Sequence, residues 1–247
     1  QEPRLHELLR TRTSVPVPQI YYFDETHQII DSDFLIMERL PGKPLTESLH
    51  VDVDNIHREI GAYLAEVHRL TASTYGYVGP HEPMVPQRSW HEAFKIMWLK
   101  LLDDIAQTGI YQKDEVRFFS DLLEDRIDLF NRPVPASLLH MDVWDQNILT
   151  DGRRVTGILD WDRALWGDPE FEFAVLDYCG ISSPAFWEGY GTPRDISPEA
   201  VKRNVFYLLY EIQKYIVIRH GRNKDTRRAL AYKQHSFALA NRLLSME

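Results

Sequence analysis

The stretch HMDVWDQNILTDGRRVTGILDWD, residues 140–162, decides the fold of this chain. Its two short apolar runs, NILT and RVTGILD, flank an Asp-Gly turn, which predicts a β-hairpin that turns at Asp151 and Gly152. Carboxylates precede the first run and follow the second, where the strands begin and end. Residues at strand ends lie where binding and catalysis concentrate, so we expect this hairpin to carry chemistry.

Four polar residues of this stretch have a spacing that suits phosphoryl transfer. His140, Asp142 and Asn147 form the pattern H-x-D-x-x-x-x-N, and Asp160 follows at the end of the second apolar run. An Asp on a short loop can accept the proton of an attacking hydroxyl. An Asn amide oxygen and a second carboxylate can hold Mg²⁺ against nucleotide phosphates. The spacing therefore predicts Asp142 as the base, with Asn147 and Asp160 as magnesium ligands.

The neighbouring residues of the stretch receive more modest predictions. His140 is expected to support its loop through hydrogen bonds rather than to act as a base. Asp145 and Asp151 are expected to solvate their loops, and Trp144 either packs or contacts a substrate. An Asp-Gly hairpin with acids at its edges is usually only a solvated turn, so the prediction depends on the whole pattern.

The composition excludes several classes of protein. A chain of 247 residues, 44% of them hydrophobic, can bury a sizeable core. A formal net charge of −9 gives no basic surface for nucleic acid or an anionic membrane. The single cysteine, Cys179, requires no oxidising compartment, and the charged N-terminal residues do not read as a secretory signal. We therefore expect a cytoplasmic protein; the sequence indicates no oligomeric state.

The order of the expected elements is strands early and helices late. Residues 2–11 predict a helix, and residues 19–23, 27–30 and 34–40 predict a small antiparallel sheet. Ile56, Ile60, Leu64 and Val67 recur at helical spacing after the possible caps at residues 52 and 54. Further amphipathic helices are expected at residues 89–104, 113–130, 197–218 and 225–244.

The segments LLHMDVWDQNIL and VTGILDWDRALWGDPEFEFA resemble the signature of the aminoglycoside phosphotransferase family, which includes choline and homoserine kinases and has a protein-kinase-like fold. FLIMERLPGKPL resembles its hinge, EPRLHELLRTRTSVPVPQIYYFDE its N-lobe helix and strand, and LAEVHRL the first C-lobe helix. The resemblance implies the same roles for Asp142, Asn147 and Asp160. It also implies that Asp168 anchors the active-site loops, while Glu172 stands where relatives usually have Asp.

The resemblance implies a bilobal α+β fold. We expect a partial β-sheet N-lobe and hinge at residues 1–40, and a helical C-lobe with the catalytic hairpin at residues 41–247.

An adenine ring needs an apolar slot with a backbone carbonyl and amide at its edge. At the hinge, these are the Glu38 carbonyl and the Leu40 amide. Met37 would lie at the back of the slot, with Leu149 and Leu159 as its floor. The alternative is that these three apolar residues are ordinary core residues.

Residues 1–37 contain neither glycine nor lysine, although a kinase of this class needs a glycine-rich phosphate loop and a strand lysine. Either the chain begins inside the N-lobe or it is a binder that keeps only the C-lobe chemistry. The first reading is favoured, since residues 1 and 2 read as mid-helix, and Glu2 would then pair with the lysine.

The sequence thus predicts an ATP- or GTP-dependent and Mg²⁺-dependent kinase that phosphorylates a hydroxyl of a small molecule, such as an aminoglycoside-like antibiotic, a choline-like compound or another metabolite. A protein substrate is disfavoured because no Ala-Pro-Glu segment follows Asp160. Asp162, Trp144 and Glu188 are candidates for acceptor binding. The alternative is a non-catalytic module that binds a nucleotide or metabolite.

Overall fold

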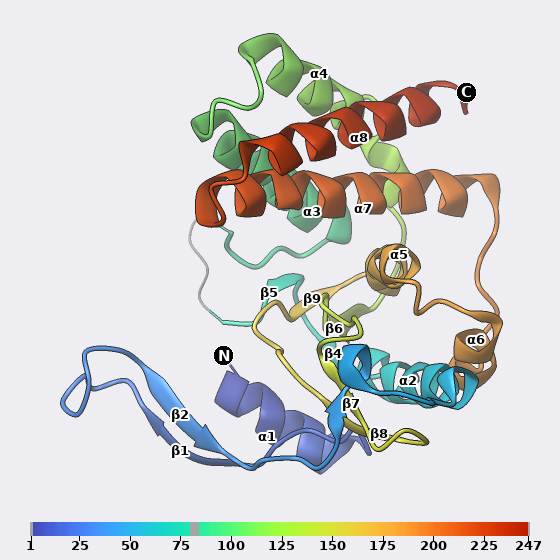
Figure 1. Cartoon of the computed structure of the whole chain (residues 1–247). Coiled ribbons are helices and arrows are strands. Elements are labelled where there is room, and N and C mark those ends of the chain that lie inside the picture. The colour runs from blue at the N-terminus through green and yellow to red at the C-terminus, as the bar shows by residue number, and fades with distance from the viewer. Residues whose placement is uncertain (1, 80–83, 247) are drawn as a thin grey trace. The chain divides into compact units, whose positions relative to one another are not determined.

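The computed structural model describes residues 2–79 and 84–246, and the chain forms two compact units (Figure 1). The first unit comprises Gln1–Thr71, Ser137–Leu165 and Leu176–Arg194. The second comprises Ala72–Ala136, Trp166–Val175 and Asp195–Glu247. The lobe boundary near residue 40 divides the chain differently and stays a prediction.

The first unit contains the helices α1 (Glu2–Arg12), α2 (Val53–His68) and α6 (Pro184–Tyr190). Helix α1 lies where it was predicted. The Asp52 side chain caps α2 by accepting a hydrogen bond from the Asn55 N–H at 3.1 Å. Ile56, Ile60 and Leu64 are fully buried, which confirms the predicted apolar face of this helix.

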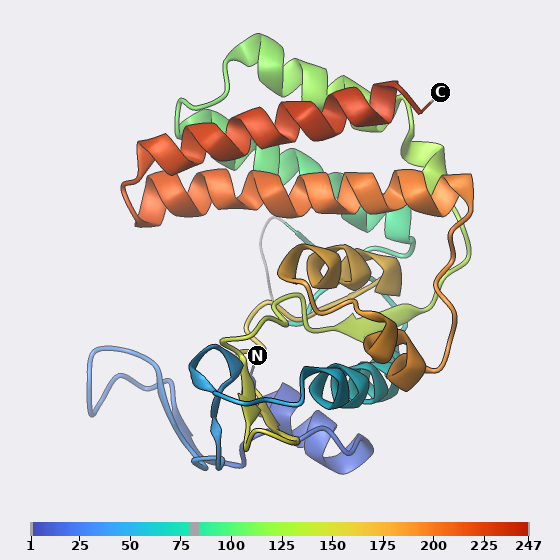
Figure 2. The ribbon, with the colours of Figure 1, turned by 45° about the vertical axis from the view of Figure 1, so that its right-hand side comes forward.

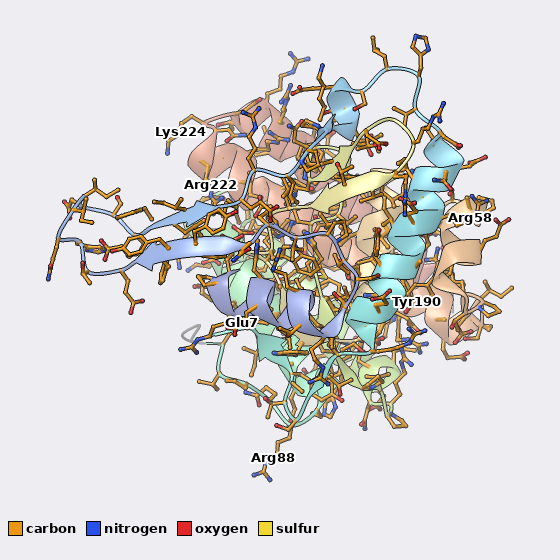
Figure 3. The ribbon with its side chains drawn as sticks, turned by 90° about the horizontal axis from the view of Figure 1, so that it is seen from below. Glu7, Arg58, Arg88, Tyr190, Arg222 and Lys224 are labelled. Carbon is orange, nitrogen blue, oxygen red and sulfur yellow. The ribbon has the colours of Figure 1, made fainter. Side chains whose placement is uncertain are left out.

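Two glycines allow α2 and α6 to approach closely. A Cβ atom on Gly61 of α2 would overlap the Phe186 carbonyl oxygen, and one on Gly189 of α6 would overlap the Arg58 carbonyl oxygen. At the far end of the pair, His68 Nδ1 and the Tyr190 hydroxyl are hydrogen-bonded at 2.8 Å. Figure 3 shows Arg58 and Tyr190 on these neighbouring helices. The backbones are therefore in direct contact, with no room for side chains between them.

The first unit also contains two small sheets. Strands β1 (Ile20–Asp24) and β2 (Phe34–Met37) form an antiparallel pair. The prediction of a strand at residues 27–30 is wrong. These residues lie in the loop that connects β1 and β2, and the side chains of Ile29 and Ile30 are exposed instead of packing against a core. The second sheet has the order β3 (Lys43–Pro44), β7 (Ile148–Thr150), β8 (Val155–Ile158). It contains the predicted hairpin, which is confirmed, and the short helix η1 (Leu45–Glu47) follows β3.

The second unit is mainly helical. It contains α3 (Trp90–Gln107), α4 (Lys113–Glu124), η2 (Ile127–Phe130), α7 (Pro198–Val217), η3 (Ile218–Arg222) and α8 (Thr226–Leu244). Figure 2 shows α7 and α8 lying side by side as an antiparallel pair. The helix predicted over residues 113–130 ends early, at Glu124. Aromatic rings form the core: Phe94 lies 4.7 Å from Phe130 and 5.2 Å from Tyr207 between ring centroids.

The remaining elements are short, apart from one helix. They are β4 (Thr71–Ala72), β5 (Gly76–Tyr77), β6 (Ala136–Leu139), β9 (Leu165–Gly167) and α5 (Pro169–Cys179). The sequence pattern did not predict α5, whose residues 171–176 are all buried. No helix among the described residues has both the length and the apolar character that crossing a bilayer requires.

Candidate active site

The β7–β8 hairpin brings the two predicted magnesium ligands to one end. Ile148 pairs with Ile158, and the Leu159 N–H donates to the Asn147 carbonyl at 2.9 Å, which continues the ladder by one step. Asn147 and Asp160 are therefore neighbours beyond the last strand residues. At the other end, the Asp151 carboxylate accepts hydrogen bonds from the Arg153 and Arg154 N–H groups, both 2.9 Å, and these bonds lower its pKa. Asp151 is a turn residue, as the sequence indicated.

The Asn147 side chain is oriented by Asp142. Its Nδ2 group donates to the Asp142 carbonyl at 2.9 Å and to the Asp142 carboxylate oxygen Oδ2 at 3.1 Å. Both partners are acceptors, so the amide nitrogen must face Asp142 and the amide oxygen must point away from it. A buried amide oxygen held in this way is a suitable hard ligand for magnesium.

His140 connects the loops that carry Asp142 and Asp160. Its Nε2–H donates to the Leu159 carbonyl at 2.9 Å, and its Nδ1 accepts the Asp142 N–H at 3.2 Å. The imidazole is fully buried, and its centroid lies 4.3 Å from the Trp161 ring. Because both ring nitrogens hold backbone groups, the geometry fits the structural support that the sequence indicated.

Two residues of the site have left-handed backbone conformations. Met141 has a φ of 66° and Asp160 a φ of 65°. This conformation costs a residue with a side chain roughly 1–2 kcal/mol, and strain of this kind clusters at functional sites. Met141 directly precedes the predicted base, and Asp160 is itself a predicted metal ligand. The hydrogen bonds of His140 to both loops stabilise these strained conformations.

Negative charge accumulates around Asp160. Partial burial raises the pKa of the Asp160 carboxyl, and the nearby Asp162 and Asp142 carboxylates raise it further. A divalent cation would relieve this repulsion. One carboxylate and one amide are enough protein ligands for magnesium, which keeps several waters. Among the described residues, no cluster of at least three His, Cys, Asp or Glu side chains able to bind metal is present.

Arg163 is a residue of the site that the sequence reading missed. Its Nη1 donates to Asp142 Oδ1 at 2.6 Å, and about a quarter of its side chain is exposed. A tight turn, in which the Ala164 N–H donates to the Trp161 carbonyl at 3.2 Å, places Arg163 after Asp160. The signal in the sequence was one basic residue among the acids of DWDRA.

The predicted hinge contacts the catalytic hairpin. The Glu38 N–H donates to the Gln19 carbonyl at 2.8 Å, and the Glu38 carboxylate accepts the Gln19 N–H at 3.1 Å. Within the described chain, the Glu38 carbonyl and the Leu40 N–H have no hydrogen-bond partner, so both are available to a ligand. Leu40 lies over Gly157, where an added Cβ would come within 2.8 Å of the leucine methyl.

The apolar side chains of the proposed slot are partly accessible to solvent, unlike the fully buried side chains of the core. Met37 is 47% exposed, and Leu40, Leu149 and Leu159 are partly exposed. Leu149 pairs with Gly157 across the hairpin, and Leu40 packs against the same glycine. An apolar surface next to two unpaired backbone groups is what an adenine ring requires.

The chain that leaves the hinge is fixed to the hairpin. The Thr156 hydroxyl donates to the Pro41 carbonyl at 2.6 Å, and Lys43 of β3 pairs with Thr150 of β7. Gly42 has a φ of 101°, and a Cβ there would lie 2.7 Å from the Thr150 carbonyl oxygen. Only glycine fits this position without displacing the strand.

In the second unit, Asp168 is the centre of a buried network. Its carboxylate accepts hydrogen bonds from Arg132 at 2.7 Å, the Tyr207 hydroxyl at 2.9 Å and the Glu170 N–H at 3.1 Å. Burial raises the pKa of Asp168, and burial together with the Asp168 charge raises that of Tyr207, so Tyr207 stays a donor. This geometry fits the anchoring role predicted for Asp168.

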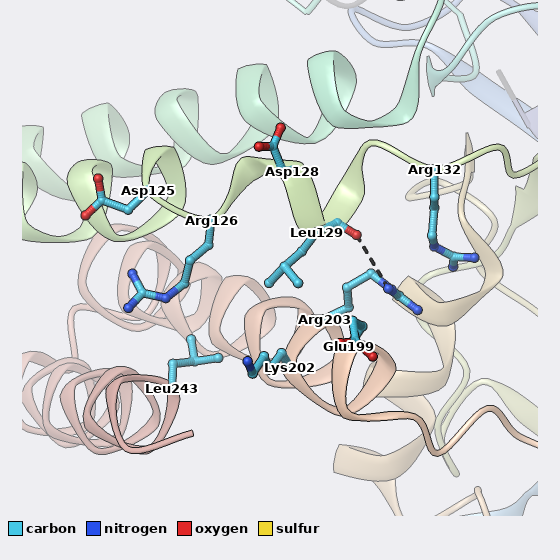
Figure 4. Close-up of a pocket in the computed structure, with 9 residues that line it drawn as sticks. All are labelled: Asp125, Arg126, Asp128, Leu129, Arg132, Glu199, Lys202, Arg203 and Leu243. Atoms are coloured by element: carbon cyan, nitrogen blue, oxygen red, sulfur yellow. Dashed lines mark hydrogen bonds between the residues drawn. The ribbon is translucent and has the colours of Figure 1, made fainter. Parts of the chain in front are cut away.

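Arg132 and Arg203 connect this network to a cavity of about 550 Å³ in the same unit (Figure 4). Arg203 is 5% exposed and binds the Glu170 carboxylate with two hydrogen bonds, at 2.7 and 3.0 Å. Since Asp168 and Glu170 already hold these two arginines, the inner wall of the cavity belongs to the structural network.

The remaining predicted residues lie in both units. Glu2 is in the first turn of α1, and Trp144 is 42% exposed in the loop after Asp142. Glu188 on α6 is 2.8 Å from Arg58 of α2, so its carboxylate is already paired. Glu172, in the second unit, is fully buried on α5. The structure thus brings together Asp142, Asn147, Asp160 and Asp162, with His140 as their support.

Solved structures that resemble this chain include proteins described as kinases of small molecules. A Thermobifida fusca protein described as a fructosamine-3-kinase matches 99% of this chain and 79% of its own, with a TM-score of 0.72 and 22% identity. The aminoglycoside phosphotransferase APH(4)-Ia matches 97% of this chain and 82% of its own, with a TM-score of 0.68 and 17% identity. These likenesses confirm the predicted kinase-like α+β fold.

The family follows from the sequence comparison. The model of the phosphotransferase enzyme family matches residues 1–194, so the chain belongs to this family, and the resemblance that the sequence suggested is confirmed. A "probable ketoamine kinase" of Vibrio parahaemolyticus is 28% identical over 220 residues, which is 83% of this chain and 69% of that protein. One from Klebsiella aerogenes is 26% identical over 230 residues, 89% of this chain and 74% of that protein. The expectation of a small-molecule kinase is thereby confirmed.

Proposed function

We propose that this protein transfers the γ-phosphoryl group of ATP to a hydroxyl of a ketoamine. The observation that carries the proposal is the meeting of Asp142, Asn147 and Asp160 at one end of the β7–β8 hairpin. The relatives named as ketoamine kinases support the acceptor class. A solved complex of APH(4)-Ia with AMP-PNP and hygromycin B supports an adenine nucleotide as the donor.

In the proposed reaction, Asp142 accepts the proton of the acceptor hydroxyl. The hydroxyl oxygen forms a bond to the γ-phosphorus, and the bond between that phosphorus and the β–γ bridging oxygen breaks, which releases ADP. The Asn147 amide oxygen and the Asp160 carboxylate would hold Mg²⁺, which supplies positive charge to the nucleotide phosphates when bound. His140 keeps the two loops in register for this step.

The nucleotide and acceptor sites follow from the exposed groups of the first unit. The Glu38 carbonyl and the Leu40 N–H would hold the adenine edge, with Met37, Leu149 and Leu159 forming the apolar slot. Trp144, two residues after Asp142, and Asp162, two residues after Asp160, both have exposed side chains. They would contact the acceptor. The reaction requires ATP, and the single cysteine needs no oxidising environment, so we place the enzyme in the cytoplasm.

The test is an acceptor screen with the full-length protein. ATP consumption is measured with fructosamines and ribulosamines, with hygromycin B and with choline, and Asp142→Asn serves as the inactive control. We expect the wild type to phosphorylate the ketoamines and not hygromycin B or choline, and we expect Asp142→Asn to phosphorylate none of them. Turnover of hygromycin B or choline, but not of ketoamines, would change the acceptor class. Nucleotide binding without turnover of any acceptor would favour a binding module.

A further inference from the structure

We infer that Arg163 selects acceptors that carry a carboxylate close to the reacting hydroxyl. This inference rests on the proposed function and names the acceptor more closely: a ketoamine formed from an amino acid, in which the sugar hydroxyls and a carboxylate belong to one small molecule. The basis is the direct contact of Arg163 with Asp142, the predicted base: the Arg163 Nη1 atom lies 2.6 Å from Asp142 Oδ1.

The hydrogen bonds of Asp142 determine where an acceptor must approach. Oδ2 accepts from the Asn147 amide, on the side of the predicted metal ligands, and Oδ1 accepts from Arg163. Each carboxylate oxygen has two lone pairs, so Oδ1 can still accept one hydroxyl while it holds the guanidinium. A hydroxyl bound there lies next to Arg163, and a carboxylate elsewhere on the same small and flexible acceptor can reach the same guanidinium.

The charges of the loop favour an acceptor with both signs of charge. Asp142 lies beside Arg163, and Asp162 directly precedes it in the chain, so their carboxylates would attract the protonated secondary amine of a ketoamine. A purely cationic acceptor would also meet the positive guanidinium of Arg163. The planar guanidinium binds carboxylates with paired hydrogen bonds, which a neutral amide group cannot accept in the same way. In a zwitterionic acceptor, the ammonium group can interact with the carboxylates of the loop and the carboxylate with the guanidinium of Arg163.

A different partner for Arg163 would be the transferring phosphoryl group, and the experiment distinguishes the two. The probes are fructosylglycine and fructosylglycinamide, which differ only in carboxylate against amide. Their binding to the nucleotide-free, full-length protein is measured by calorimetry, and their KM and kcat are measured with ATP. The variants are Arg163→Met and the control Arg69→Met, an exposed arginine at the end of α2 whose side chain forms no hydrogen bond or ion pair in the described chain.

The wild type is expected to prefer fructosylglycine by about tenfold or more in both Kd and KM, the size of effect expected from one charged hydrogen-bonded pair. Arg163→Met should remove this preference in Kd and KM by weakening the binding of fructosylglycine. It should also lower kcat for both compounds by a common factor, because Asp142 loses the partner of its Oδ1 atom. Arg69→Met should keep the preference. Equal Kd and KM for the two compounds in the wild type would overturn the inference while leaving the proposed function intact. A preference in Kd and KM that Arg163→Met retains would overturn the inference and leave Arg163 with the orientation of Asp142 or with the phosphoryl group. Failure of the wild type to phosphorylate either compound would overturn the proposed function, and the inference with it.

Discussion

Asp142 binds an amide through one carboxylate oxygen and a guanidinium through the other, so its carboxylate has a fixed orientation before any substrate arrives. A base that is already oriented loses little freedom when the acceptor binds, which is one source of catalytic advantage. The left-handed Met141 just before it belongs to the same arrangement, because the turn directs Asp142 toward Asn147.

Replacing Asp142 with Asn should lower kcat by a factor of about 10² to 10⁴, the usual contribution of a positioned base. Asn is nearly isosteric, so the fold and the affinity for magnesium nucleotide should be retained. Steady-state kinetics with an accepted ketoamine, combined with nucleotide titration, measure the two effects separately. If each folded molecule of the variant turned over at nearly the wild-type rate, Asp142 would be a structural residue only.

Asp160→Asn should remove the magnesium-dependent part of nucleotide binding. Asn tolerates the left-handed conformation observed at this position, so the loop should keep its shape while the ligand charge is lost. Nucleotide affinity is titrated with and without Mg²⁺ in the wild type and the variant. A variant whose affinity still rises on addition of Mg²⁺ to the wild-type extent would show that the metal is held by other residues.

At the scale of elements, the contact between the hinge and the hairpin depends on Gly42. Gly42→Ala should lower the free energy of unfolding by about 2–4 kcal/mol, because backbone strain and overpacking add at this position. Gly180→Ala is the matched control, since Gly180 also has a positive φ, of 76°, but an added Cβ there meets no atom within 4 Å. The control should lose only about 1–2 kcal/mol. Denaturant unfolding measures both, and equal losses would show that the contact with Thr150 contributes nothing.

The pair α2 and α6 supports a second prediction at this scale. Gly61→Ala should destabilise the protein by about 1–3 kcal/mol, because the added methyl group overlaps the Phe186 carbonyl and must push the helices apart. Gly221→Ala in η3 should be neutral or stabilising by up to about 1 kcal/mol, since its Cβ meets open space and alanine favours helices. Thermal and denaturant unfolding would reveal the opposite signs; a stabilised Gly61 variant would contradict the close packing.

At the scale of the whole molecule, stability should fall as the pH drops below about 6.5, in part through His57. Burial lowers the pKa of His57 from its ordinary value of 6.5, although the Asp145 and Asp54 charges oppose the shift. The unfolded chain then binds this proton more readily than the folded protein does, so acid favours unfolding. His57→Gln should reduce the slope of stability between pH 7.5 and 5.5, and the exposed His235→Gln should not. Identical slopes in all three proteins would rule out His57 as a contributor.

The features that the sequence predicted well are local. The β7–β8 hairpin follows from an Asp-Gly turn between two apolar runs, and α2 follows from its spacing and its cap at Asp52. Helix α5 was missed because residues 171–176 are buried all round, which leaves no polar face to give a helical period. The false strand at residues 27–30 arose because the exposed Ile29 and Ile30 resemble strand residues by type alone.

The candidate site was predictable where its spacing was fixed by the hairpin and hidden where it depended on distant partners. Asn147 and Asp160 lie at the same end because the ladder register requires it. Arg163 forms its hydrogen bond with Asp142 across 21 positions of sequence. The loop that brings it there includes the left-handed Asp160, a conformation that no local sequence pattern indicates. The ion pairs of Arg132 and Arg203 around Asp168 likewise join segments that the sequence gives no reason to place together.

The two hydrogen bonds of His140 make it a natural spectroscopic probe. Since Nε2 donates to the Leu159 carbonyl and Nδ1 accepts the Asp142 amide, the ring is held as one neutral tautomer. The two ring nitrogens of a ¹⁵N-labelled histidine then have well-separated resonances, one protonated and one not. A movement of either loop on ligand binding would shift one resonance and spare the other, so a single side chain would report which loop responds to nucleotide and which to acceptor.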